Sequence, residues 1–157
     1  MNIFTIMNNI DALKDILSAV LYRWGSKYQQ QLKGNLDKLG KVDTGTLKAS
    51  IRFSVDELQL EVNMVDYARF VHYGRGPGKF PPVDAIRGWV ERKGLTIQGS
   101  SAPLETQQRQ LTYLIGRKIA TVGIDPSPFI DDLPIDEIAD ELVAEIGDWL
   151  VANLFEE

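Results

Sequence analysis

Residues 42–75 read VDTGTLKASIRFSVDELQLEVNMVDYARFVHYGR, and the rest of the chain is arranged around this stretch. It begins with a turn at 42–51, continues as alternating apolar and polar residues to position 64, and ends in an aromatic unit at 66–75. Period-two alternation is typical of a half-buried β-strand. The middle segment therefore predicts a β-hairpin with one apolar face.

The register of this hairpin depends on its turn. With Asp56 and Glu57 as the turn, Phe53 faces Leu60 and every apolar side chain lies on one face of the hairpin. Asp-Glu lacks the glycine that positive φ favours in a two-residue turn, so a wider loop is the open alternative.

Length and composition predict one domain. A chain of 157 residues with 44% hydrophobic residues buries one sizeable core and leaves little room for a second. The expected parts are an N-terminal helix at 9–39, a core at 42–130 that contains a helical insertion at 82–122, and a C-terminal helix at 134–155.

The expected fold class is α+β, with a small antiparallel sheet. The hairpin at 50–64 supplies two strands, and the proline-containing segment near 124–130 supplies an extended edge, because its prolines exclude a helix. The long N-terminal helix, the two middle helices and the amphipathic C-terminal helix are expected to pack on this sheet. The run at 28–31 dilutes the apolar face of the first helix, which suggests contact with another subunit.

Composition excludes several classes of site. The chain has no cysteine and a single histidine, His72, so it contains no disulfide, no thiol nucleophile and no cysteine or histidine-rich metal site. We expect no cofactor. The N-terminus has no basic region, and no apolar run is long enough to cross a bilayer, so neither a cleaved signal nor a membrane span is expected.

Charge is divided unevenly along the chain. Residues 1–118 carry 17 basic and 11 acidic groups, whereas residues 119–157 carry 11 acidic groups and no basic ones. The split indicates either a surface for a charged partner or a solvated acidic helix face. The nine basic residues from Arg69 to Lys118 favour a protein partner over nucleic acid, because few aromatic residues are interleaved with them.

Asp43-Thr44-Gly45 also occurs in retropepsin-like aspartic proteases after an apolar residue, here Val42. The later segment 114–117, Leu-Ile-Gly-Arg, is similar to a second motif of that family. Such an enzyme would use Asp43 from each of two chains to activate water. The alternative is structural: Asp43 caps a helical turn and Gly45 adopts positive φ.

Two further features have structural and functional interpretations. The loop 74–81 is glycine-rich but lacks the Gly-Lys-Ser or Gly-Lys-Thr ending of a phosphate loop, so flexibility is the expected reason for its composition. His72 lies among aromatic residues without a serine or cysteine nucleophile motif nearby, which favours a packed histidine over a catalytic one.

Several short motifs together resemble the head–tail joining and tail-completion proteins of long-tailed bacteriophages. They are Asp43-Thr44-Gly45 with Leu47-Lys48 and Ser50-Ile51, then Tyr67-Ala68 through Val71 to Gly74, and Pro128-Phe129-Ile130 before a final helix. Their order also matches, and the likeness runs from about residue 9 to 155. The helical insertion at 82–122 and Tyr73-Gly74-Arg75 differ from the family pattern.

The resemblance implies a non-enzymatic virion protein, made in the host cytoplasm and placed in the neck of the phage particle. It would form a ring of about six or twelve copies around the DNA channel and contact connector and tail proteins, near packaged DNA but without sequence-specific binding or membrane contact. A generic assembly module is a further alternative. Residues expected to form interfaces or structural motifs are Asp43, Thr44, Gly45, Tyr67, Tyr73, Gly74, Arg75, Pro128 and Phe129.

The charge split suggests how copies would meet in such a ring. The basic middle of one copy would contact the acidic C-terminal helix of the next. Asp140 and Glu141 lie on the acidic face of that helix and are the positions at which charge reversal would test this hypothesis.

Overall fold

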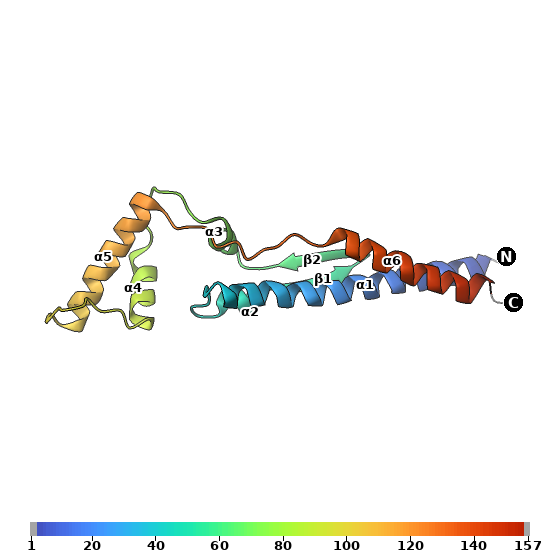
Figure 1. The fold of residues 1–157 in the computed structure, drawn as a ribbon, viewed down its shortest axis with the longest axis horizontal. Helices are drawn as coiled ribbons and strands as arrows, with labels where there is room; N and C mark the ends of the chain where they lie inside the picture. The colour runs from blue at the N-terminus through green and yellow to red at the C-terminus, as the bar shows by residue number, and fades with distance from the viewer. Residues whose placement is uncertain (1–2, 156–157) are drawn as a thin grey trace. The chain divides into compact units, whose positions relative to one another are not determined.

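The computed structural model describes residues 3–155 and combines helices with a small sheet (Figure 1). Within these residues the elements are, in chain order, α1 (Ile3–Lys38), α2 (Thr46–Ser50), β1 (Arg52–Asp56), β2 (Gln59–Asn63), α3 (Ala68–Tyr73), α4 (Val83–Arg92), α5 (Leu104–Val122), α6 (Ile135–Leu150) and the π-helical turn η1 (Val151–Phe155). The chain is 62% helical, against roughly one third in an average domain. The expected α+β class is confirmed, with helix packing as its main component.

The chain divides into two compact units, and each is described by itself. The hairpin unit contains residues Met1–Asp66 and Phe129–Glu157, and the helical unit contains residues Tyr67–Pro128. The expectation of a single domain stays a prediction, because contacts in one structure do not measure whether two units unfold together.

A stripe along α1 forms the core of the hairpin unit. Its members recur every fourth residue, and each is at most 7% exposed: Val20, Trp24, Tyr28, Leu32 and Leu36. Residues four apart are neighbours on a helix surface, so the stripe forms one continuous apolar line that winds slowly around the helix. This helix begins earlier than the expected residue 9 and ends at Lys38.

The hairpin packs on a second face of α1. The rings of Tyr22 and Phe53 meet edge to face with centroids 5.0 Å apart, and Gln29 Nε2 donates a hydrogen bond to the carbonyl oxygen of Ile51 at 2.7 Å. Gly25 lies between these two positions on the helix. A Cβ atom there would be 2.5 Å from Phe53 and 2.7 Å from Leu60, so only glycine allows the hairpin to approach this closely.

The segment that returns from the helical unit is held by polar side chains of α1. Asn35 Nδ2 donates to the carbonyl oxygen of Phe129 at 3.0 Å, and Gln31 Nε2 donates to the Asp131 carboxylate at 2.8 Å. The Tyr28 hydroxyl donates to the Asp131 carbonyl oxygen. Tyr28 and Gln31 of the run at 28–31 therefore bind a distant part of the same chain, and contact of this helix with another subunit stays a prediction.

Helix α6 then packs on the N-terminal half of α1. Ile138 is buried with Val20 and Trp24, and Leu133 and Leu142 pack against this cluster. The expected C-terminal helix is confirmed, with its last residues in the π-helical turn.

The hairpin register differs from the expected one. Phe53 pairs with Val62 and Val55 with Leu60, because the turn lies at Glu57 and Leu58 instead of at Asp56 and Glu57. Both turn residues have positive φ, 44° and 67°, as a tight primed turn requires. The shift along the partner strand is two residues, so the side chains keep their faces and the prediction of one apolar face holds.

The expected edge strand near 124–130 does not join this sheet. In the described residues 3–155 the sheet contains β1 and β2 alone, and Ile124 forms a single antiparallel bridge with Arg75 in the helical unit. Proline at positions 126 and 128 removes the backbone donors that a strand ladder needs. The two middle helices also differ from expectation, because they belong to the helical unit and pack on each other.

Helices α4 and α5 form the body of the helical unit. Ile86 and Val90 on α4 are buried, and Gln107 on α5 is 8% exposed. The Gln107 side chain accepts a hydrogen bond from the Ile97 backbone at 2.9 Å and donates to the Ala102 carbonyl oxygen at 2.6 Å. Gln107 thereby fixes the polar loop between the helices, because a buried amide is stable only when it is hydrogen-bonded.

The two glycines inside α1 provide a matched test of the hairpin contact. Gly25→Ala is expected to lower the free energy of unfolding, because overpacking against Phe53 and Leu60 costs about 1–3 kcal/mol and exceeds the helix-propensity gain of about 1 kcal/mol. Gly34→Ala is expected to raise it by up to about 1 kcal/mol, since nothing lies within 4 Å of the added Cβ. Urea unfolding of both variants measures the difference. Equal stabilisation by both substitutions would contradict the contact.

Candidate functional site

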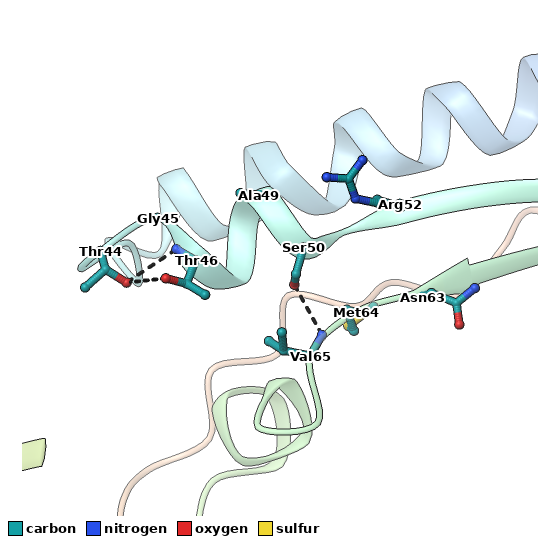
Figure 2. A pocket seen from close by; sticks show the side chains of 9 residues that line it. All are labelled: Thr44, Gly45, Thr46, Ala49, Ser50, Arg52, Asn63, Met64 and Val65. Atoms are coloured by element: carbon teal, nitrogen blue, oxygen red, sulfur yellow. Dashed lines mark hydrogen bonds between the residues drawn. The ribbon is translucent and has the colours of Figure 1, made fainter.

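The Asp43-Thr44-Gly45 segment forms a bend that leads into α2. Figure 2 shows Thr44 and Gly45 immediately before this helix. Gly45 has φ of 79°, as expected for this position. The Thr44 hydroxyl lies 2.8 Å from the Thr46 hydroxyl and accepts a weak hydrogen bond of 3.4 Å from the Thr46 backbone N–H. The Thr44 hydroxyl thus caps the first residue of α2, and a capping role for Asp43 stays a prediction.

A shallow groove of about 900 Å³ opens beside this turn, between α2 and the ends of the two strands. Ser50 forms part of its wall, and its hydroxyl accepts a hydrogen bond from the Val65 backbone N–H at 3.2 Å (Figure 2). The lining residues are Thr44, Gly45, Thr46, Ala49, Ser50, Arg52, Asn63, Met64 and Val65.

The groove offers binding groups and lacks acid–base groups. Its nine lining residues supply hydroxyls, one amide and one guanidinium, but no carboxylate and no imidazole. Asp43 is near the groove in sequence and is not part of its lining. These groups can hold a polar partner by hydrogen bonds, and proton transfer would need a residue from elsewhere.

The aromatic unit at 66–75 contains the short helix α3. Tyr67 occupies the N-cap position, and no side chain caps the helix there. Gly74 ends the helix with φ of 75°. Tyr67 and Tyr73 are 43% and 76% exposed, so both are accessible on the surface of the helical unit. The His72 ring packs edge to face on Tyr73, with centroids 4.4 Å apart, which agrees with a packed histidine.

The glycine-rich loop 74–81 is anchored along α5, although its composition indicated flexibility. Arg75 and Ile124 exchange backbone hydrogen bonds of 2.9 and 2.7 Å, and the Gly78 N–H donates to the Ala120 carbonyl oxygen at 2.8 Å. Gly74 is required by space as well as by φ, since a Cβ would lie 2.5 Å from the Ile124 carbonyl oxygen. The loop therefore follows a defined path on the helical unit.

Gly116 explains the apparent Leu-Ile-Gly-Arg motif in structural terms. Residues 114–117 lie inside α5, and the ring of Phe80 occupies the space where a Gly116 Cβ would stand. Phe80 also stacks on Tyr113, with ring centroids 6.3 Å apart. Gly116 is therefore needed for the packing of the loop residue Phe80 on α5. This packing explains the glycine of the Leu-Ile-Gly-Arg segment without a protease motif.

Pro128 is exposed, whereas Phe129 is completely buried in the hairpin unit. Phe129 is the largest of the fully buried side chains, and its carbonyl oxygen accepts the bond from Asn35 described above. Among the residues expected to form interfaces or structural motifs, Phe129 therefore has the burial of a structural anchor. Tyr67 and Tyr73 have the exposure of an interface residue.

Sequence reasoning missed a polar cluster between α1 and α6. The Arg23 guanidinium donates to Glu141 Oε1 at 2.6 Å and also pairs with Glu145, while Trp24 Nε1 donates to Glu141 Oε2 at 2.6 Å. The hydrogen bond from Arg23, followed by that from Trp24, lowers the pKa of the Glu141 carboxyl below its ordinary value. The spacing of Glu141 and Glu145 by four residues on α6 was the available signal, but the sequence does not show which cation meets them.

The two compact units carry opposite net charge. The helical unit at 67–128 has nine basic and four acidic residues, whereas the remainder of the chain has eight basic and eighteen acidic residues. The uneven distribution of charge along the sequence thus gives the helical unit a positive net charge and the rest of the chain a negative one.

A search of residues 3–155 finds no group of three or more His, Asp or Glu side chains that could bind a metal ion. Over the same span, no helix is both long and apolar enough to cross a membrane. Comparison of the chain with protein-family models, with curated proteins and with solved structures finds no match in any of the three.

The Glu141 cluster predicts how stability depends on pH. Because folding lowers the pKa of Glu141, its contribution to stability is complete above the ordinary value of 4.5 and disappears as pH falls through the lowered value. The wild-type protein is expected to lose stability more steeply below about pH 4.5 than Glu141→Gln. Asp148→Asn, at an exposed position of the same helix, is the control. Urea unfolding between pH 7 and 3 measures the slopes, and identical slopes for wild type and Glu141→Gln would contradict the assignment.

Proposed function

We propose that this protein is a structural component of the neck of a long-tailed bacteriophage, where it completes the tail or joins the head connector to the tail tube. In this proposal several copies form a ring around the DNA channel. The proposal rests on the resemblance of its short motifs to head–tail joining and tail-completion proteins, and on the features of the fold that follow.

The observation that carries the proposal is that each resembling motif coincides with a separate structural feature, in the family's order. The long helix α1 comes first, the Asp43-Thr44-Gly45 turn opens α2, and the hairpin follows. The aromatic segment forms α3 and ends at Gly74, and Phe129 anchors the chain before α6. Short motifs that match by chance have no reason to fall at successive turns and anchors of one fold.

The surfaces of the single chain also favour assembly. Large apolar side chains are exposed on both units, among them Tyr73, Tyr113, Leu114, Ile135 and Val143. Grouped exposed apolar residues commonly mark protein–protein contacts. Opposite net charges on the two units suit head-to-tail contacts, because such contacts join different surfaces of identical copies and close into rings.

Mass spectrometry of purified phage particles tests this proposal. Peptides of this chain are counted against isotope-labelled standards, with portal peptides measured in the same digest as the reference. The proposal predicts a small fixed number of copies, about six or twelve per portal ring. Absence of the chain from particles that contain portal and tail proteins would overturn it.

A further inference from the structure

We propose that neighbouring copies of this protein bind through two helix surfaces, a basic stripe on α5 of one copy and an acidic stripe on α6 of the next. The inference deepens the proposed function by naming the contact that would build the ring, and it rests on that function only for the place of the ring in the virion. Each stripe lies within one compact unit, so the argument uses the geometry of each unit alone.

The basic stripe consists of Arg109, Tyr113, Leu114, Arg117 and Lys118. Arg109, Tyr113 and Arg117 are four residues apart, so they lie in a row on one side of α5. Tyr113 is 60% exposed and Leu114 is 53% exposed, and the three cations are also exposed. A hollow of about 430 Å³ lies along the row at Arg109, Gln110, Tyr113 and Leu114. In the part of the chain that the structure describes, the three cationic side chains form no ion pair.

The acidic stripe consists of Ile135, Asp136, Ala139, Asp140 and Val143. These positions recur at intervals of three to four residues and form one face of α6, on which Ile135 is 63% exposed and Val143 is 72% exposed. Between residues 3 and 155, neither Asp136 nor Asp140 has an ion-pair partner. The stripe is thus an exposed surface with unpaired acids beside apolar side chains.

The two stripes match in length, charge and composition. At 1.5 Å per residue the basic stripe is about 14 Å long and the acidic stripe about 12 Å long. Each combines charged side chains with large apolar ones, so contact would bury apolar surface and pair opposite charges at the same time. Charge pairing fixes the partner and the orientation, and apolar burial supplies most of the affinity.

A second copy of this chain is the occupant that the structure favours over nucleic acid. The partner of the basic stripe must supply acids at helical spacing next to apolar groups, and α6 of another copy has this combination. A nucleic acid backbone supplies charge without apolar side chains to cover Leu114. Because every copy carries both stripes, each contact leaves one stripe of each kind open for the next copy, which is the condition for a ring or a filament.

The structure also changes which acids should be tested. Glu141 was a candidate for charge reversal from sequence, but its carboxylate binds Arg23 and Trp24 of the same chain. Reversal there would disturb the packing of α6 on α1. Asp136 and Asp140 are the appropriate positions, since their side chains have no such role.

The experiment uses two full-length variants with complementary charge reversals. The first, Arg109→Glu with Arg117→Glu, makes both stripes acidic. The second, Asp136→Lys with Asp140→Lys, makes both stripes basic. The control, Lys79→Glu with Arg87→Glu, changes net charge as much as the first variant at exposed positions of the helical unit outside the stripe. Circular dichroism melting confirms that each variant folds, and sedimentation velocity measures association.

The wild type and the control are expected to associate, and added salt is expected to weaken the association. Each stripe variant alone is expected to associate at least about tenfold more weakly, because like charges then face each other across the contact. An equimolar mixture of the two variants is expected to restore assembly with alternating copies in a 1:1 ratio, since every contact in an alternating ring again joins opposite charges.

Failure of the mixture to assemble would overturn the inference, as would association of either variant at wild-type strength or absence of association in the wild type. Contact between the two stripes of a single chain would also leave the mixture unassembled. If the first variant loses affinity for a DNA oligonucleotide while self-association is unchanged, the basic stripe binds nucleic acid and the inference is wrong.

Restored assembly of a chain that is absent from phage particles would retain the contact and remove the neck assignment. Detection of the chain in phage particles, together with a mixture that fails to assemble, would retain the neck assignment and remove the contact.

Discussion

The buried stripe on α1 is the constraint on which the hairpin unit depends. Its residues are spaced by four, and each step of four turns about 40° beyond a full helical turn, so the stripe rotates by about 160° from Val20 to Leu36. A single partner element cannot cover a line that rotates this far. Helix α6 covers it at Val20 and Trp24, while the return segment is bound from Tyr28 to Asn35. The hairpin packs on the neighbouring face of α1, which includes Gly25.

Helices α5 and α6 each keep an exposed side within their own unit. Apolar side chains and unpaired charges remain exposed there, acidic on α6 and basic on α5. A two-helix pair such as α1 and α6 buries one face of each helix, so an amphipathic stripe wider than that face stays open. The distribution of charge between the units then gives the open faces opposite sign, which is the physical basis of the proposed head-to-tail contact.

Local pattern predicted most of the elements, and contacts between distant residues decided the rest. The periodicity of α1, α4, α5 and α6 and the alternation of the hairpin were sufficient for their type, although α1 begins at Ile3 instead of the expected residue 9. The turn at Glu57 and Leu58 was missed because neither residue favours positive φ. The roles of Gly25 and Gly116, the bonds to Asp131 and the Arg23–Glu141 pair join residues far apart in sequence, where no periodicity operates. The functional assignment stays a proposal, because motif order indicates a class of protein and does not measure assembly.

Electron cryomicroscopy of the neck of the phage particle would test the central claim most directly. The account predicts a rotationally symmetric layer around the DNA channel in which each copy contributes the α1, hairpin and α6 assembly, with α5 of one copy against α6 of its neighbour. A neck in which every layer is occupied by other chains would contradict the assignment. A layer built from this chain, with α5 and α6 both facing solvent, would contradict the contact.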